Sequence, residues 1–383
     1  MTRRRDGTCP IPHGPSLSGQ DLERGVPMHE IPKTMKAMVL TAYNQLELRE
    51  VPVPKPGRNE VLCRIRSVAI CGSDPQIIRG DRPGQWPQQF PHILGHEWAG
   101  EVVALGEDVR EFQVGDRVAG EAHAGCGYCK NCLAGNYTIC LNYGKPETGA
   151  RHFGFNYDGA NCEYNVYPTK TIHKIPDTLS FDHAALCDIC GVAMHCIDRT
   201  GVTVSGTVAI FGPGPAGVAA MQIVKGYGAS KVIMIGRGDR LQHAKECGAD
   251  YIVDITKEDP VERVLEITGG FGADEVFDCA GGSQVPSQCM KLVKRGGKIG
   301  LLAHYHDENL TMPNLTDMIS NELTIYGSRA NPGVSEAVIS MLDRKIIDGD
   351  TLVTHRFPLE EYKTALDVFV GRKDHSLKVV INP

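Results

Sequence analysis

Long apolar runs and an excess of positive charge are both missing from this chain of 383 residues. No apolar run reaches the ~18 residues that a membrane-spanning helix needs, so no membrane partner is expected. The net charge of −6 provides no electrostatic preference for nucleic acid. No apolar segment follows Arg3, Arg4 and Arg5, which argues against a secretory signal.

Cysteine is abundant, but its distribution is not that of a secreted disulfide framework. Four of the 14 cysteines lie within 15 consecutive residues. This clustering favours reduced thiols and metal binding, so a cytoplasmic protein is expected. The length indicates two domains, and 42% hydrophobic residues supply a core. Residues 1–34 are rich in proline, glycine and charge, which predicts an N-terminal extension, poorly ordered or packed on a sister subunit.

The first part of the chain has the pattern of an antiparallel β domain. Short apolar or alternating segments are separated by glycine and proline, as in half-buried strands joined by turns. The predicted strands cover residues 35–40, 46–51, 60–70, 101–105, 116–119 and 162–167. We expect them to form a partly barrel-like catalytic domain over residues 35–190.

From about Gly191 the pattern changes to alternating strands and helices. The predicted strands are 207–211, 231–235, 251–254, 275–278, 298–302 and 323–326, and the helices between them include 241–247 and 260–267. Alternation at this spacing predicts a parallel, doubly wound α/β sheet over residues 191–330. Residues 331–383 contain two amphipathic segments and a last strand at 378–382, and we assign them back to the first domain.

One loop carries four closely spaced thiols, at Cys126, Cys129, Cys132 and Cys140. Zinc prefers tetrahedral sulfur ligands, and four cysteines fill every position around it. The spacing therefore predicts a closed, structural zinc site that leaves no position for a substrate. A disulfide pair, free thiols and an iron–sulfur cluster are the alternatives.

A second, open metal site is predicted from Cys71, His96 and Glu97. Thiolate and imidazole bind zinc well, and a catalytic zinc keeps three protein ligands and one exchangeable position. Asp188 is the candidate that completes the ligand set, with Cys190 as its rival. Glu97 either binds the metal directly or approaches it only when water or substrate leaves.

Such a site would carry out alcohol chemistry. Zinc lowers the pKa of a substrate hydroxyl, and the carbon that bears this hydroxyl then gives a hydride to nicotinamide. Ser73 stands two residues from Cys71 and is placed to take the hydroxyl proton. We therefore expect a catalytic set of Cys71, Ser73, His96, Glu97 and Asp188.

The turn after the strand 207–211 has the pattern Gly-x-Gly-x-x-Gly and opens a helix. In that setting glycines let the backbone approach the pyrophosphate of a dinucleotide, which lies at the helix N-terminus. The predicted cofactor contacts in this turn are Gly212, Gly214, Pro215, Ala216 and Gly217.

The choice between NAD and NADP is predicted at the end of the next strand. NAD enzymes carry an acidic residue there to bind the ribose hydroxyls, but this chain has Gly236 followed by Arg237. A missing carboxylate removes repulsion against a 2′-phosphate, and arginine pairs with phosphate. We therefore expect NADP(H) to be preferred, with Arg237 and Arg240 as contacts. NAD(H) remains an alternative cofactor, because Asp239 can turn back toward the ribose. The alternative for Arg237 and Arg240 is that they lie in a solvated loop and bind no cofactor.

The sequence resembles the zinc-dependent medium-chain dehydrogenase/reductase family in four features. They are the segment Gly95-His96-Glu97-Trp98-Ala99-Gly100 with Gly106 and Val109 beyond it, the four-cysteine spacing, the segment Cys71-Gly-Ser-Asp74 and the order of elements. The resemblance covers residue 35 to the end. It implies an α/β protein with a GroES-like, β-rich catalytic domain and a Rossmann dinucleotide-binding domain.

Within the family, Asp188 falls at the acidic ligand position of sorbitol and threonine dehydrogenases, where alcohol dehydrogenases carry cysteine. The segment 186–195, which ends in Met-His, also resembles the polyol subgroup. By resemblance Ser73 begins the proton relay, but Gln76 stands where polyol enzymes often have histidine, so a water chain or a ribose hydroxyl is expected to continue it. The resemblance also implies that Arg329 lies near the nicotinamide or the pyrophosphate.

Together these patterns predict a dehydrogenase of a polyol, sugar alcohol or hydroxy amino acid, with two zinc ions per chain and NADP(H). The alternatives are a reductase of ketones or aldehydes, a non-catalytic binding or regulatory protein, and a thiol redox role for Cys187 and Cys190. A homodimer or homotetramer is expected, with a small-molecule alcohol or ketone as substrate. Residues suggested for the substrate pocket are Trp86, Trp98, His152, Phe153 and Phe155.

Overall fold

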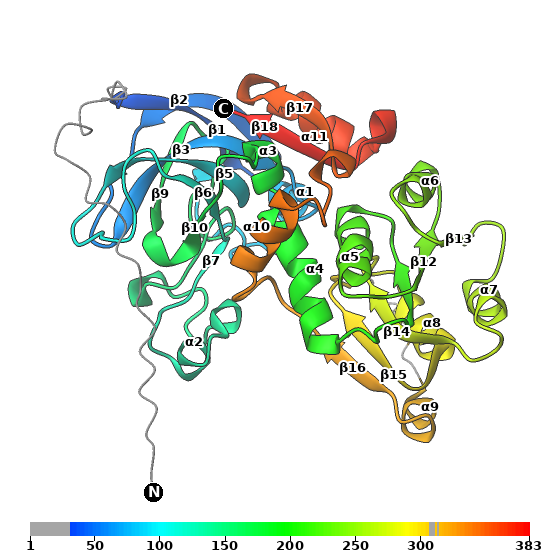
Figure 1. Cartoon of the computed structure of the whole chain (residues 1–383). Coiled ribbons are helices and arrows are strands. Elements are labelled where there is room, and N and C mark those ends of the chain that lie inside the picture. Colours follow the sequence, from blue (N-terminus) through cyan, green and yellow to red (C-terminus); the bar gives the residue numbers. More distant parts are fainter. Residues whose placement is uncertain (1–30, 306–310, 312–313) are drawn as a thin grey trace, which may run out of the picture. The chain divides into compact units, whose positions relative to one another are not determined.

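The computed structural model describes residues 31–305, 311 and 314–383, coloured along the chain in Figure 1. The extension predicted over residues 1–34 lies almost wholly outside the described residues. Residues 33–383 form one unit by their contacts, so the division predicted near residues 190 and 331 stays a prediction. No described helix combines the length and the apolar character that a membrane crossing requires.

The first sheet system is mainly antiparallel, as the alternating pattern predicted. Its strands are β1 (Thr34–Ala42), β2 (Gln45–Pro52), β3 (Glu60–Ala69), β4 (His92–Ile93), β5 (Glu97–Leu105), β6 (Arg117–Gly120), β7 (His123–Ala124), β8 (Arg151–His152), β9 (Tyr164–Pro168), β10 (Ile172–Lys174), β17 (Val353–Pro358) and β18 (Lys378–Asn382). The largest sheet has the order β10-β6-β5-β3-β18-β17, and β9 also pairs with β3. Two smaller sheets have the orders β2-β1-β4 and β7-β8.

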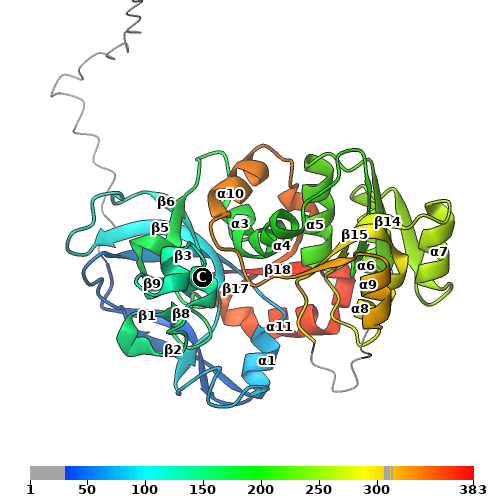
Figure 2. The same cartoon turned by 90° about the horizontal axis from the view of Figure 1, so that it is seen from below.

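The C-terminal strand pairs with a strand from the start of the chain. β18 runs antiparallel to β3, with Val380 opposite Ala69 and Ile381 opposite Val68. On its other edge β18 pairs in parallel with β17, which the sequence pattern did not predict. Figure 2 shows these two C-terminal strands beside each other. This pairing carries Lys378, the first residue of β18, to the end of β3.

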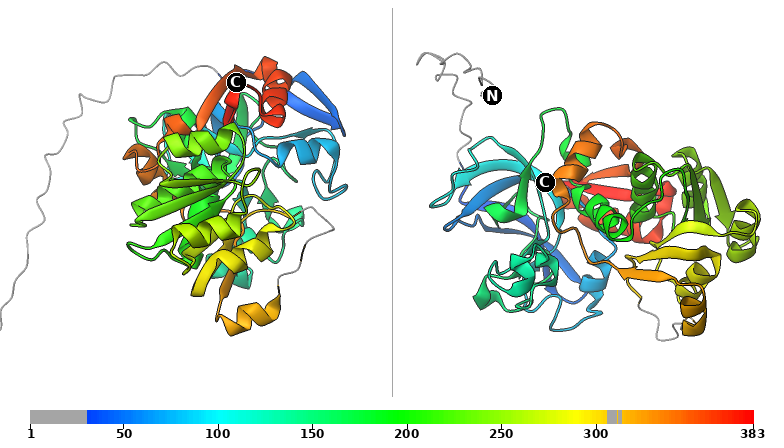
Figure 3. Two further views of the ribbon diagram at one scale, coloured as in Figure 1. Left: turned by 90° about the vertical axis from the view of Figure 1, so that its right-hand side faces the viewer. Right: turned by 60° about the horizontal axis from the view of Figure 1, so that its bottom comes forward.

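The second sheet is parallel throughout and has the order β13-β12-β11-β14-β15-β16. Its strands are β11 (Thr207–Phe211), β12 (Lys231–Gly236), β13 (Tyr251–Asp254), β14 (Ala273–Asp278), β15 (Val293–Leu301) and β16 (Thr324–Gly327). Successive residues of β11 face opposite sides, so Val208 and Ile210 join one core cluster while Ala209 and Phe211 join another. The predicted doubly wound sheet is confirmed, and Figure 3 shows its strands between layers of helices.

The helices are α1 (Asp74–Arg79), α2 (Lys130–Leu133), α3 (Phe181–Ala184), α4 (Cys187–Thr200), α5 (Pro215–Gly226), α6 (Asp239–Glu246), α7 (Pro260–Ile267), α8 (Val285–Leu292), α9 (Leu315–Ser320), α10 (Ser335–Asp343) and α11 (Tyr362–Gly371). The 14-residue α4 was not predicted, because its cysteines had been interpreted only as metal ligands. It packs against α5 and α10 and presents Asp188 in its first turn.

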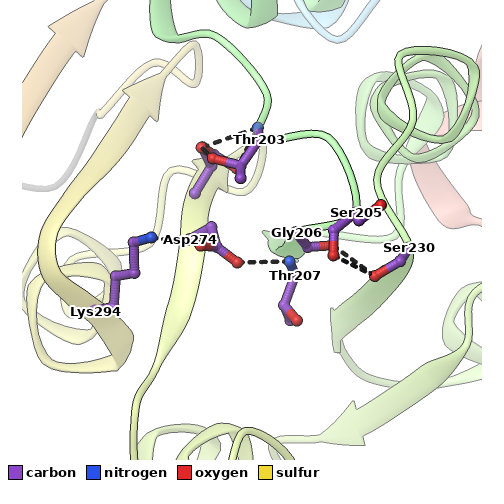
Figure 4. Close-up of polar contacts among 8 residues, drawn as sticks. Thr203, Ser205, Gly206, Thr207, Ser230, Asp274 and Lys294 are labelled. Atoms are coloured by element: carbon purple, nitrogen blue, oxygen red, sulfur yellow. Dashed lines mark hydrogen bonds and ion pairs between the residues drawn. The ribbon is translucent and has the colours of Figure 1, made fainter.

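Polar contacts connect the strands at the start of the parallel sheet, as Figure 4 shows. Asp274 accepts a hydrogen bond from the backbone N–H of Thr207 at 2.7 Å. It also forms an ion pair with Lys294 at 2.5 Å. Glu275 accepts the hydroxyl of Thr203 at 2.6 Å. These contacts join the N-terminal ends of β11, β14 and β15. A ligand of such a sheet binds at the opposite, carboxyl ends of the strands.

Candidate active site and metal centres

The four predicted thiols converge on one point. The sulfur atoms of Cys126, Cys129, Cys132 and Cys140 all lie within 4.8 Å of one another, and none is in a disulfide. The sulfur atoms of Cys126 and Cys132 are 3.9 Å apart, as are those of Cys129 and Cys140. Four sulfurs bound to one zinc at about 2.3 Å would be about 3.8 Å apart, so the arrangement fits a tetrahedral zinc.

Backbone and side-chain N–H groups point at these sulfurs. Asn142 donates from its backbone to Cys140 and from its side chain to Cys126, both at 3.3 Å. Burial acts in the opposite direction, but hydrogen bonds from the backbone of Tyr128 and from Asn142 lower the pKa of the Cys126 thiol to about 6. A thiolate at neutral pH is the form that binds a metal.

The loop that holds the four thiols is anchored through Glu121, whose side chain is 1% exposed. Its carboxylate accepts hydrogen bonds from Tyr137 at 2.6 Å, from His173 at 2.8 Å and from Ser335. The Tyr137 hydroxyl in turn accepts the backbone N–H of Gly333 at 2.9 Å. Glu121 therefore connects the four-cysteine loop to the start of α10.

A second group of donor atoms comes from Cys71, His96 and Glu97, which also lie within 4.8 Å of one another. Cys71 follows β3, and His96 and Glu97 stand at the start of β5. Gly95 has a φ of 92°, and a side chain there would come within 2.7 Å of Asn161, so only glycine fits before His96. The close approach of the two segments places thiol, imidazole and carboxylate around one point.

Asp74 lies against this group and holds the backbone of Cys71, although the sequence reasoning assigned it no role. Its Oδ2 accepts the backbone N–H of Cys71 at 2.8 Å, and its Oδ1 lies 3.8 Å from Nδ1 of His96. The second distance is that of an electrostatic contact, longer than a hydrogen bond. A carboxylate on one ring nitrogen of a histidine orients the other for a metal. The signal was present in the segment Cys71-Gly-Ser-Asp74.

Lys378 is the other residue that the sequence reasoning missed. Its side chain is 2% exposed, and its Nζ lies 2.5 Å from Oε2 of the fully buried Glu97. It also donates to the carbonyl of Ile70 at 3.0 Å. No other lysine or arginine in the described part of the chain is buried. The sequence did contain a signal for this role, because Lys378 is the single charged residue at the start of an otherwise apolar strand segment, 378–381.

Acidic groups outnumber cations at this site. Cys71, Asp74, Glu97 and Asp188 gather around His96 and the single Lys378. Burial and the charge of Glu97 raise the pKa of the Cys71 thiol above its ordinary value. A buried excess of acidic groups is costly without a cation, so the donor set fits a divalent metal bound by Cys71, His96 and Glu97.

Asp188 and Cys190 lie nearby but outside the compact group formed by the described donor atoms. Burial and the charge of Glu97 raise the pKa of Asp188 to about 7, while the charges of His96 and Lys378 act in the opposite direction. Cys190 is fully buried and its thiol is influenced by Glu97 and Asp188. Both rivals for the remaining ligand position therefore lie within electrostatic range of the site. The Ser73 hydroxyl is also buried, near enough to Cys71 to affect the pKa of its thiol.

A group of aromatic and imidazole rings packs beside His96. The ring of His96 lies 4.7 Å from Phe155, which stacks on His152 at 3.7 Å. Trp86 lies 5.0 Å from Phe155, so three of the suggested pocket residues lie beside the site. Trp98 and Phe153 instead pack on Tyr167 inside the β domain, so their suggested place in the pocket was wrong.

His123, which the sequence reasoning did not single out, stacks on His152 at 3.8 Å. Burial and the charge of Arg329 lower the pKa of His123 to about 3. Arg329 itself lies 4.9 Å above the ring of Tyr143, and its carbonyl accepts the Thr138 hydroxyl at 3.2 Å. The loop after β16 is thus fixed against the four-cysteine loop.

The glycine turn has the geometry that a dinucleotide requires. Gly212 has a φ of 94°, and Gly214 precedes Pro215, the first residue of α5. A side chain at Gly217 would come within 1.9 Å of the carbonyl of Gly212, so turn and helix approach closely. Gly214 has open space where a side chain would be, which leaves the backbone there accessible.

Position 236 carries glycine rather than an acidic residue for a steric reason. A side chain there would come within 2.3 Å of the ring of Pro213, and a proline ring cannot rotate away. Arg237 follows and is exposed. Arg240, also predicted as a cofactor contact, donates two hydrogen bonds to the carbonyl of Ser376, at 2.9 and 2.7 Å. Its guanidinium is thus already engaged with the C-terminal segment.

Comparison with known proteins agrees with this geometry. Residues 57–177 match the family described as Alcohol dehydrogenase GroES-like domain, and residues 215–344 match Zinc-binding dehydrogenase. A sorbitol dehydrogenase of Bacillus subtilis strain 168 is 34% identical over 93% of this chain and 99% of its own length. The chain belongs to the zinc-dependent medium-chain dehydrogenase/reductase family. It is an oxidoreductase of the alcohol and polyol dehydrogenase type.

Other relatives of this medium-chain dehydrogenase differ in substrate. A D-arabitol-phosphate dehydrogenase of Enterococcus avium is 32% identical over 92% of this chain and 99% of that protein. An L-threonine 3-dehydrogenase of Bacillus licheniformis is 33% identical over 87% of this chain and 94% of that protein. The resemblance to the sorbitol and threonine subgroup is therefore confirmed.

Solved structures share the fold of this medium-chain dehydrogenase. A zinc-binding dehydrogenase from Sinorhizobium meliloti 1021 bound to NADP has a TM-score of 0.84 and 31% identity, over 92% of this chain and all of that one. An alcohol dehydrogenase from Escherichia coli CFT073 with NADH has a TM-score of 0.83 and 28% identity, at the same coverage. The predicted GroES-like and Rossmann architecture is confirmed.

Proposed function

We propose that this chain is a zinc- and NADP(H)-dependent dehydrogenase of a secondary alcohol in a polyol, sugar alcohol or hydroxy amino acid. The main support is the convergence of the Cys71 thiol, the His96 imidazole and the Glu97 carboxylate within 4.8 Å of one another, a donor set that suits zinc. The named relatives act on sorbitol, arabitol phosphate and threonine, which share a secondary alcohol beside another polar group. A cytoplasmic homodimer or homotetramer is part of the proposal.

A zinc ion bound here would supply Lewis acidity, which lowers the pKa of a substrate hydroxyl. Cys71 and His96 would hold the ion, and the Asp74 carboxylate faces the His96 ring at 3.8 Å. Lys378 holds Glu97 by its charge, so that Glu97 lies at the site without needing to bind the ion permanently. The buried hydroxyl of Ser73 would accept the proton of the substrate hydroxyl as it gives its own proton to a water chain or a ribose hydroxyl.

The glycine turn would hold the dinucleotide, which would supply the hydride acceptor or donor of the reaction. Gly212, Gly214 and Gly217 let the backbone reach the pyrophosphate, and the N-terminus of α5 favours its charge. Pro215 and Ala216 contribute the first turn of that helix, and Arg329 contacts the nicotinamide end. In the reverse direction the same groups reduce a ketone, which fits NADPH as the donor.

Metal content tests the two sites separately. The purified protein should contain about two zinc ions per chain, as atomic absorption would measure. Asp188→Ala should lose the catalytic zinc and the activity but keep about one zinc in the four-cysteine loop. Cys190→Ala is the matched control, because it removes the rival ligand two residues away, and it should keep both ions. Full activity of Asp188→Ala would transfer the ligand role to Cys190 or Glu97.

Cofactor preference is tested by steady-state kinetics with each cofactor. We expect kcat/KM with NADP to exceed that with NAD, because Gly236 offers no carboxylate to the ribose and Arg237 offers a guanidinium. Arg237→Gln should lower kcat/KM with NADP by about tenfold to a hundredfold, the value of one or two charge-assisted hydrogen bonds. The value with NAD should change little. A strong NAD preference of the wild type would refute the role given to Arg237.

A further inference from the structure

A hollow of about 490 Å³ opens beside the end of β12, at the C-terminal edge of the parallel sheet. Its lining combines the loop after β12 with a segment from the far end of the chain. The lining residues are Arg237, Gly238, Asp239, Arg240, Asp254, Thr256, Arg372, His375 and Ser376. This volume suits a nucleoside phosphate, and the adenosine of a dinucleotide lies at this place in such sheets.

The acidic residues of the hollow already have partners. Asp254 accepts hydrogen bonds from the backbone and hydroxyl of Thr256, at 3.0 and 2.7 Å, and pairs with Lys257 at 3.1 Å. Asp239 lies 3.0 Å from Nδ1 of His375. The partners of both carboxylates are thus residues other than the arginines of the hollow.

The basic residues, in contrast, lack an anion. Neither Arg237 nor Arg372 makes a side-chain hydrogen bond or ion pair with any residue that the structure describes. Arg240 uses its guanidinium on the carbonyl of Ser376, which carries no net charge. Burial and the charge of Arg372 lower the pKa of Arg240 to about 10, so the two guanidinium groups repel each other. A doubly charged anion in the hollow would remove this repulsion.

The segment that carries Arg372 is held in a fixed conformation. Arg372, Asp374 and His375 have φ angles of 50°, 50° and 59°, in the left-handed region that is unfavourable for such residues. Ser376 is buried and donates to the carbonyl of Val368 at 3.0 Å. The two bonds from Arg240 clamp the Ser376 carbonyl to α6 and so bring Arg372 to the hollow.

We propose that Arg372, from the C-terminal segment, binds the 2′-phosphate of NADP(H) together with Arg237, and that Arg240 is a positioning residue that acts through the Ser376 carbonyl. The proposal rests on the dinucleotide function proposed above and adds a specificity residue outside the Rossmann segment. The 2′-phosphate is the dianion that the two unpaired guanidinium groups require.

Nucleotide fragments test the proposal without turnover. Adenosine 2′,5′-bisphosphate and adenosine 5′-monophosphate differ only in the 2′-phosphate, and calorimetric titration of the zinc-loaded protein measures the affinity of each. The wild type should prefer the bisphosphate. Arg372→Gln should weaken the bisphosphate by about tenfold to a hundredfold and leave the monophosphate within about twofold. The reversed charge in Arg372→Glu should weaken it further.

Neighbouring variants separate charge from position. Lys373→Gln removes an adjacent charge that does not line the hollow, and it should leave both affinities unchanged. Arg240→Lys keeps the charge but cannot clamp Ser376 with two bonds, so it should weaken the bisphosphate selectively. In that background, Arg372→Gln should have a smaller effect than in the wild type. Equal effects in both backgrounds would overturn the positioning role.

The outcomes distinguish this inference from the proposed cofactor preference. If the wild type binds both fragments equally, the NADP preference itself fails. If the wild type prefers the bisphosphate and Arg237→Gln alone abolishes that preference, the role of Arg372 is overturned while the NADP preference stands. A selective loss in both single variants supports the shared site.

Discussion

Replacing Cys71 by alanine should lower kcat/KM by about a thousandfold or more, because the Lewis acid contributes several kcal/mol to the reaction and each 1.36 kcal/mol is about tenfold in rate. Cys71 supplies the only thiol among the described donor atoms that group with His96 and Glu97. Without it, two donors remain, with the more distant Asp188, and the ion should be lost. Zinc analysis should find about one ion per chain, the one in the four-cysteine loop.

Cys63→Ala is the matched control for this experiment. Cys63 is fully buried on β3, the strand that leads to Cys71, and it belongs to neither group of donor atoms. Its replacement should keep both zinc ions and most of the activity. A Cys71→Ala protein that retains two ions and near-normal kcat/KM would show that the catalytic metal, if any, lies elsewhere.

Replacing Lys378 by methionine should destabilise the protein by about 3–5 kcal/mol, the usual cost of leaving one member of a buried ion pair without its partner. Lys378 and Glu97 are 2% and 0% exposed, so water cannot replace the lost charge. The carbonyl of Ile70 would also lose its donor. Urea unfolding followed by circular dichroism should show the loss as a lower midpoint at an unchanged slope.

A double-mutant cycle isolates this ion pair from general packing effects. Glu97→Gln alone leaves Lys378 unpaired, and the combination Lys378→Met with Glu97→Gln leaves neither charge. We expect the double variant to be more stable than the sum of the single losses implies, by about 1–3 kcal/mol. Additive losses would mean that the pair contributes nothing as a pair. Lys363→Met, on the exposed face of α11, is the control for the loss of a lysine charge.

The strands and helices with strong local patterns were well predicted from the sequence. β11, β13 and α7 have the predicted bounds, because alternating or continuous apolar residues, capped by glycine or proline, determine such elements locally. Helix α4 and strand β17 were missed. In α4 the sequence mixes cysteine, glycine and polar residues, and its helical state depends on packing against α5 and α10.

The candidate site shows the same division. The two groups of candidate metal ligands and the tight glycine turn were predicted, because metal coordination and phosphate binding demand particular residue types at particular spacings. Arg240 was predicted as a cofactor contact and Trp98 as a substrate-pocket residue, in both cases because of the residues next to them in the sequence. The structure instead has Arg240 on the Ser376 carbonyl and Trp98 stacked on Tyr167.

By itself, then, the sequence determined the family, and it predicted the two groups of candidate metal ligands and the dinucleotide turn, since these depend on short segments whose chemistry is local. Tertiary structure alone decided three things. It placed Lys378 on Glu97, it put Pro213 where an acid at position 236 would lie, and it brought Arg372 to the end of β12. Each depends on strand register or packing between distant segments, and no periodicity within the chain records such contacts.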